Sequence, residues 1–198
     1  MSTHDHDHDV ESGEHEHDED AARDAERLAR KRIALAQIRQ YGDPVLRMPA
    51  GEVVSFDDEL ARVAERMAAL MHDADGVGLA ATQVGILRRF FVFHDEGHDR
   101  VLVNPVITRR AGALEVDEEG CLSLGSVRVP VERQVEVTLE AKDEKGNDVR
   151  LEFEGLPARV VQHEVDHLDG VLIIDRTDPA SRKEAMAQLR PRLLISAR

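Results

Sequence analysis

The sequence predicts an α+β fold, with helices toward both ends of the chain and strands in its middle. Three observations support this prediction. Apolar residues recur at spacings of three and four over residues 57–73, which is typical of an amphipathic helix. Short runs rich in Val, Leu and Phe alternate with turn signals between residues 90 and 153. After Gly155 the apolar pattern returns to a helical period.

The start of the chain divides into a tail and a domain. Residues 1–20 alternate His with acidic residues and have little apolar surface to bury, so we expect a disordered His/Asp-rich tail. The tail could hold metal loosely, although a solvated run of charge is the favoured interpretation. Residues 21–198 are expected to form a single domain. It begins with an Ala/Arg/Leu-rich helix over 21–36 and ends in a C-terminal helix.

The predicted elements follow in order along the domain. Asp57 or Asp58 caps the helix over 57–73, which glycines 76 and 78 end. The segments expected to be strands are 90–93, 101–103, 114–116, 127–131, 135–141 and 149–153, the last two joined by a hairpin turn. A helix over 156–169 has Pro157 in its first turn. A short strand at 172–175 and a helix at 178–190 complete the chain.

Composition excludes several classes of protein. The formal net charge of −14 repels nucleic-acid phosphates, so we expect no DNA partner. No run of eighteen apolar residues could span a membrane, and the N-terminus lacks the pattern of a signal peptide. Cys121 is the sole cysteine, which rules out a disulfide within the chain and suits a cytoplasmic protein.

A metal-binding motif stands in the helix predicted over 156–169. His163 and His167 are four residues apart, so their imidazoles lie on one helical face and can bind one cation. Glu164 follows His163 by about 100° around the axis, from where its carboxylate can act on a water in an open coordination position. By itself, the motif is about as often a chance match as a metal site.

Two histidines are one protein ligand too few, because a catalytic metal site usually has three protein ligands and one exchangeable water. The favoured third ligand is Cys121, since thiolates bind zinc and iron strongly. The alternatives that remain open downstream are Asp175, Asp178 and Glu184. Two other functions are compatible with these residues: a zinc endopeptidase, and a non-enzymatic protein that binds metal through its tail.

Three segments together resemble the signature motifs of the bacterial peptide deformylase family. They are GVGLAATQ at 76–83, EGCLS at 119–123 and QHEVDHLDG at 162–170, in the family's order. The resemblance implies antiparallel sheets packed around a central helix that carries the histidines. It also implies hydrolysis of the N-formyl group from the N-terminal methionine of newly synthesised proteins, with release of formate.

The resemblance assigns roles to individual residues. Cys121, His163 and His167 would hold one divalent metal ion, Fe²⁺ first, with Zn²⁺, Ni²⁺ and Co²⁺ as alternatives. Glu164 would transfer protons. By the family pattern, the side-chain amide of Gln83 and the backbone N–H of Leu122 would donate to the formyl oxygen.

A methionine side chain needs an apolar pocket beside the metal. Leu156 and Val160 share a helical face with His163 and are candidates, as is Val77. Gly78 would allow an extended peptide to approach closely. The competing interpretation makes Leu156 and Val160 plain core residues and Gly78 part of a helix end.

Two regions lie outside the motifs. Gly125 stands where the family often has proline, so the local turn there is expected to differ. Either Arg128 or Arg133 is expected to pair with Glu119.

The basic stretch over 182–198 could contact the ribosome, although a solvated helix face is the simpler interpretation.

Overall fold

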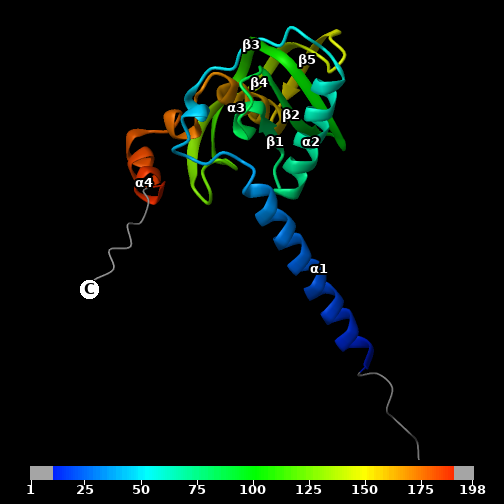
Figure 1. Ribbon diagram of the computed structural model, residues 1–198. Helices are drawn as coiled ribbons and strands as arrows, with labels where there is room; N and C mark the ends of the chain where they lie inside the picture. The colour runs from blue at the N-terminus through cyan, green and yellow to red at the C-terminus, as the bar shows by residue number, and fades with distance from the viewer. Residues whose placement is uncertain (1–10, 190–198) are drawn as a thin grey trace, which may run out of the picture.

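The computed structural model describes residues 11–189, which form a five-stranded antiparallel sheet with helices on both faces (Figure 1). The predicted α+β class is confirmed, and the structure has one sheet where several were expected. The helices are α1 (Glu11–Leu35), α2 (Asp58–Asp73), α3 (Leu156–Leu168) and α4 (Pro179–Leu189). The strands are β1 (Gly78–Ala80), β2 (Phe90–Asp95), β3 (His98–Gly120), β4 (Arg128–Lys142) and β5 (Asp148–Glu154). Short 3₁₀ turns are η1 (Pro44–Arg47), η2 (Ala81–Val84) and η3 (Ile173–Asp175).

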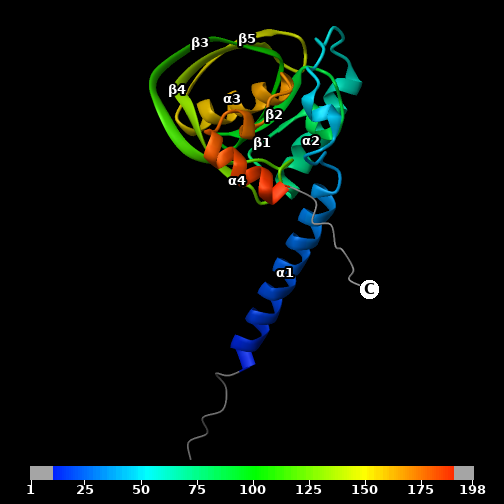
Figure 2. The same cartoon turned by 90° about the vertical axis from the view of Figure 1, so that its left-hand side faces the viewer.

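The sheet is a meander in which each strand pairs with the next along the chain, in the order β1-β2-β3-β4-β5. The register of β3 against β4 shifts at three places along the ladder. Such irregularities bend a strand and increase its twist. Figure 2 shows the result, since β3, β4 and β5 curve around α3.

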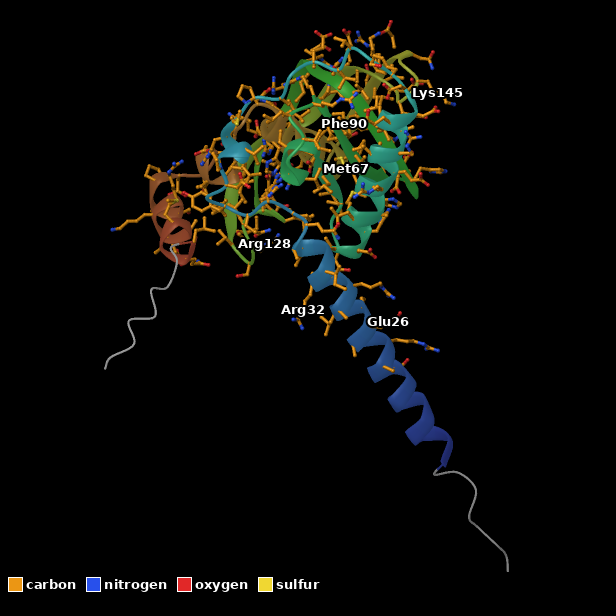
Figure 3. The ribbon with its side chains drawn as sticks, viewed as in Figure 1. Glu26, Arg32, Met67, Phe90, Arg128 and Lys145 are labelled. Carbon is orange, nitrogen blue, oxygen red and sulfur yellow. The ribbon has the colours of Figure 1, made fainter. Side chains whose placement is uncertain are left out.

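Strand β2 lies at the centre of the core and is buried on both faces. Phe90 and Val92 pack with α2 in one apolar cluster, whereas Phe91 and Phe93 pack with α3 in another. Burial on both faces accounts for a continuous apolar run in place of alternation. Each buried Phe contributes roughly 1.5–3 kcal/mol. Figure 3 shows Phe90 in the body of the domain beside Met67 of α2.

Helix α1 corrects the predicted boundary of the tail. Residues 11–20 are helical, although the sequence pattern assigned them to a disordered segment; residues 1–10 lie outside the described part. The helix-forming Glu, Ala, Arg and Leu continue through residue 35, and Arg30 pairs with Glu26 one turn earlier at 2.9 Å. The helix projects from the body of the domain, and Figure 3 shows Glu26 and Arg32 along it.

Several predicted strands merge or change type. The segments at 101–103 and 114–116 belong to the single strand β3, and those at 127–131 and 135–141 to β4. Residues 172–175 were predicted as a strand but contain η3, where Asp175 accepts from the Leu172 N–H at 3.0 Å and closes a tight turn. Among residues 11–189, no helix is long and apolar enough to cross a membrane.

Candidate metal centre and active site

Helix α3 presents the metal-binding motif to a cavity. Its apolar face, which includes Val161, Val165 and Leu168, packs against the sheet. The adjoining face therefore carries His163 and His167, whose ring centroids lie 4.9 Å apart. The spacing of four residues brings the imidazoles together, as the sequence predicted.

Cys121 joins the two histidines just after the end of β3. Its Sγ lies 3.2 Å from Nε2 of His167, and one ligand atom from each of the three residues lies within 4.8 Å of the others. Two ligand bonds of about 2.0–2.3 Å that meet at a tetrahedral angle place their donor atoms about 3.3–3.8 Å apart. The distance between Cys121 and His167 is close to this range, so the donor set fits one divalent metal. The backbone N–H of Ser123 donates to the sulfur at 3.4 Å.

The alternative third ligands are engaged elsewhere. Asp175 accepts from Arg182 at 2.7 Å and from Arg47. Asp178 caps α4 by accepting from the backbone N–H of Ala180 at 2.8 Å. Glu184 is exposed on α4 and does not belong to the cluster formed by Cys121 and the histidines.

A buried ionic network orients the first histidine. Glu119 accepts from Nδ1 of His163 at 3.0 Å, which leaves Nε2 directed to the metal position. Arg133 holds Glu119 through two hydrogen bonds of 2.8 and 2.9 Å and holds Asp166 at 2.7 Å. Burial alone would raise the pKa of Glu119, but these bonds from Arg133 and His163 keep that pKa well below its usual range. Of the two arginines considered from sequence, Arg133 is the one that pairs with Glu119, and the pair is buried. Arg159 also donates to Glu119, at 2.8 Å.

Glu164 lies beside the two histidines with one of its carboxylate oxygens unpaired among the described residues. Its side chain is buried, and its Oε2 makes no hydrogen bond among the described residues. Burial raises the pKa of Glu164 to about 7. A carboxyl group with such a pKa can both take and return a proton near neutral pH.

Gln83 lies in the wall of the site with its amide fixed. Its Oε1 accepts from the Ala80 N–H at 2.9 Å, and its Nε2 donates to Ser123 Oγ at 3.1 Å and lies 3.7 Å from the Cys121 sulfur. The donor end of the amide therefore faces the metal position. Leu122 lines the same cavity, and its carbonyl accepts from Gln40 at 3.1 Å.

A cavity of about 560 Å³ opens beside these groups. All four predicted substrate residues line it, namely Val77, Gly78, Leu156 and Val160. Val77 and Leu156 are more than half exposed, whereas Val160 is buried. The structure thus places them on one surface with the ligands, and their role stays a prediction.

Helix α1 supplies part of the cavity wall that sequence reasoning missed. Lys31 and Leu35 line the cavity, and Lys31 pairs at 2.9 Å with Asp75, another lining residue. No local pattern pointed to this contact, because it arises only when α1 packs against the end of α2.

The turn after Cys121 contains a glycine with a positive φ. Gly125 has φ +62°, in the left-handed region. Proline is locked near φ −65°, so it could not occupy this conformation. Glycine adopts it without a steric penalty.

Gly78 is required by its closeness to Glu164. A Cβ at this position would meet the Glu164 carboxylate, with Cδ 2.9 Å away. We expect Gly78→Ala to displace this carboxylate and lower kcat by roughly 10²-fold, the effect of a misplacement of about 1 Å. Formate release and metal content are measured on the same sample. The metal content should not change.

Gly51→Ala is the control for Gly78→Ala. A Cβ at Gly51 meets nothing nearer than the Leu87 carbonyl oxygen at 3.6 Å, so activity should stay unchanged. Full activity in Gly78→Ala would show that the carboxylate does not need its present position.

A cysteine sulfur and two imidazoles around one position, beside a buried carboxyl group and an open cavity, define a metal-dependent hydrolase. A sequence model of the polypeptide deformylase family matches residues 35–183. The peptide deformylase of Thermotoga neapolitana is 50% identical over 147 residues, covering 74% of this chain and 89% of that protein. Peptide deformylase 1 of Corynebacterium glutamicum is 47% identical over 162 residues, covering 80% and 96%.

Solved structures agree with the sequence comparisons. The crystal structure of a Synechococcus elongatus peptide deformylase in complex with actinonin matches with a TM-score of 0.74 and 46% identity, covering 76% of this chain and 84% of that one. The Thermotoga maritima peptide deformylase matches with a TM-score of 0.70 and 48% identity, covering 72% and 97%.

The chain belongs to the polypeptide deformylase family. It is a metal-dependent hydrolase whose activity is removal of the N-formyl group from the N-terminal methionine of nascent proteins. The predicted family and function are confirmed, and the endopeptidase and non-enzymatic alternatives are set aside.

Proposed function

We propose that Cys121, His163 and His167 hold one divalent metal ion for deformylation and that Glu164 carries the protons. The observation that carries this proposal is the buried Glu164 carboxylate, one oxygen of which has no hydrogen-bond partner in residues 11–189, beside three converging ligand atoms. A bound divalent ion supplies Lewis acidity and lowers the pKa of water. Everything else in the reaction is assigned to groups of the chain.

The reaction adds water to the formyl carbon and breaks its bond to the amine nitrogen. Glu164 takes a proton from the attacking water and delivers it to the leaving amine, so formate and a free N-terminus result. Negative charge grows on the formyl oxygen in between. The Gln83 amide and the Leu122 backbone N–H are proposed to donate to that oxygen.

The methionine side chain is proposed to lie along the cavity wall formed by Val77, Leu156 and Val160. Exposed apolar side chains at the rim, such as Leu156 and Val77, lose contact with water when a substrate covers them. Gly78, without a Cβ, would let the peptide backbone approach the strand end.

The native metal is proposed to be Fe²⁺, with Zn²⁺, Ni²⁺ or Co²⁺ able to replace it. We expect Cys121→Ser and His163→Ala each to lose the tightly bound ion from anaerobically purified protein. Elemental analysis of the parent should find one ion at this site. Retention of that ion by both variants would contradict the assigned ligands.

The Gln83 donor should matter for kcat. We expect Gln83→Leu to lower kcat by about 10²–10³-fold while the metal stays bound, because one donor to the developing charge is lost. Single-turnover formate release and metal content check this. Gln37→Leu, which removes an exposed amide, is the control. A change in KM alone would assign Gln83 to substrate binding.

Two further proposals concern the setting of the enzyme. Its substrates are nascent chains, so we place it in the cytoplasm beside the ribosome. The basic C-terminal stretch is the proposed contact, although Arg182 already donates to Asp175 and residues 190–198 lie outside the described part. Unchanged cosedimentation with ribosomes after deletion of residues 182–198 would remove this proposal.

A further inference from the structure

A second group of metal-ligating side chains lies apart from the active-site cavity. It consists of His72 in the last turn of α2, His94 in β2 and Asp99 near the start of β3. None of the three lines the cavity beside Glu164. Their side chains are 46%, 41% and 34% exposed, so an ion from solvent can reach them.

The three side chains converge on one point. Nε2 of His72 and Nδ1 of His94 each lie 2.8 Å from the same Asp99 oxygen, Oδ1. Neighbouring ligands at right angles around an ion, with bonds of about 2.1 Å, stand about 3 Å apart. One ligand atom from each residue lies within 4.8 Å of the others, as at the active site.

The imidazole pair repeats the arrangement of the active-site pair. The rings of His72 and His94 have centroids 5.1 Å apart at an interplanar angle of 78°. Those of His163 and His167 are 4.9 Å apart at 66°. Edge-to-face rings let one nitrogen from each point at a shared position.

Local charge also favours a cation at this position. His72 lies at the C-terminal end of α2, where the helix dipole is negative. The Asp99 carboxylate has hydrogen-bond partners only in these two imidazoles among the described residues. The nearby Arg100 is turned to Asp95, to which its Nε donates at 2.9 Å, so it does not supply the missing positive charge.

We propose that His72, His94 and Asp99 form a second, surface site for a divalent transition-metal ion. Two imidazoles and one carboxylate suit Zn²⁺, Co²⁺, Ni²⁺ or Fe²⁺, and solvent completes the coordination shell. The ion would tie the end of α2 to β2 and β3. This site is independent of the deformylation machinery.

The test uses the full-length chain with Zn²⁺ at the active site. Glutamines replace His4, His6, His8, His15 and His17, so that the tail cannot contribute ligands. Co²⁺ is titrated in, because it binds most sites less tightly than Zn²⁺ and should not displace the active-site ion. The visible absorption bands report its coordination, and a sulfur charge-transfer band would reveal entry into the Cys121 site.

We expect the parent to bind one Co²⁺ per chain in addition to the Zn²⁺, without a sulfur charge-transfer band. His94→Ala and Asp99→Asn should each weaken binding at least about tenfold, comparable to losing a group that supports a metal. His98→Ala is the matched control, since this neighbouring exposed histidine is hydrogen-bonded to the Glu96 carbonyl at 2.9 Å and does not belong to the cluster. Formate release by these exposed-site variants should equal that of the parent, which also verifies their folding.

Two results would overturn the proposal. Uptake of no additional Co²⁺ by the parent would mean that the cluster is only a hydrogen-bonded His–Asp–His group. Equal uptake of Co²⁺ by the parent, His94→Ala and Asp99→Asn would place the ion elsewhere. So would a loss of Co²⁺ affinity in His98→Ala as large as that in His94→Ala and Asp99→Asn. Neither result bears on deformylation, because formate release is measured separately in the same samples.

Discussion

Replacement of Glu164 by glutamine should lower kcat by about 10²–10⁴-fold while the metal stays bound. The amide has nearly the same shape as the carboxyl group but cannot take a proton from water or return it to the leaving amine. Glu164 does not belong to the cluster of ligand atoms, so the ion should remain. Formate release and elemental analysis on the same sample measure both effects.

The control for this variant is Glu154→Gln, which makes the same chemical change at an exposed position on β5. It should keep the activity of the parent. Loss of metal together with activity in Glu164→Gln would contradict the assigned role, because it would make Glu164 part of the metal site. Undiminished activity would contradict it as well.

Replacement of Arg133 by methionine should destabilise the protein by about 3–5 kcal/mol, the usual effect of breaking a buried ion pair from one side. Arg133 is 5% exposed and bridges Glu119 and Asp166. Without it, the two buried carboxylates lose the cation that bridges them, and only Arg159 remains on Glu119, at 2.8 Å, and Arg176 on Asp166, at 2.6 Å. Denaturant unfolding of the variant and the parent, both with metal bound, measures the change in the free energy of unfolding.

Arg150→Met provides the comparison for Arg133→Met. Arg150 pairs with Glu140 at 3.2 Å, but both side chains are more than half exposed. Such a pair contributes about 0–1 kcal/mol, so this variant should unfold almost like the parent. Equal, small effects of the two substitutions would show that the buried network contributes no more than a surface ion pair.

Residues close together in sequence are the ones whose placement could be predicted. His163 and His167 lie on one face because helix geometry fixes residues four apart. The amphipathic pattern predicted α2. Asp57 caps this helix by accepting from the Leu60 N–H at 3.0 Å. The alternating hairpin pattern gave the pairing of β4 with β5.

Long-range packing explains what the sequence could not provide. Cys121 lies 42 positions before His163, and only the curved β3–β4 ladder brings it to the metal position; the family resemblance, not spacing, predicted this. Arg133 bridges Glu119 on β3 and Asp166 on α3, and no local period encodes such a contact. The same holds for Lys31, which reaches the cavity from α1.

The helix at 11–20 was missed for a different reason. Its acidic and histidine-rich composition resembles that of disordered segments, which lack apolar surface to bury. Local propensity and charge pairs at helical spacing, such as Arg23 with Asp20 at 3.3 Å, favour the helix instead.

Formate release from formyl-Met-Ala-Ser by anaerobically purified, full-length protein is the decisive measurement of deformylation at this metal centre. We expect one formate per peptide deformylated, with Met-Ala-Ser left intact. The activity should disappear when a chelator removes the metal and return when Fe²⁺ is added. Folded, metal-replete protein that released no formate, or that cleaved the Met-Ala bond instead, would contradict it.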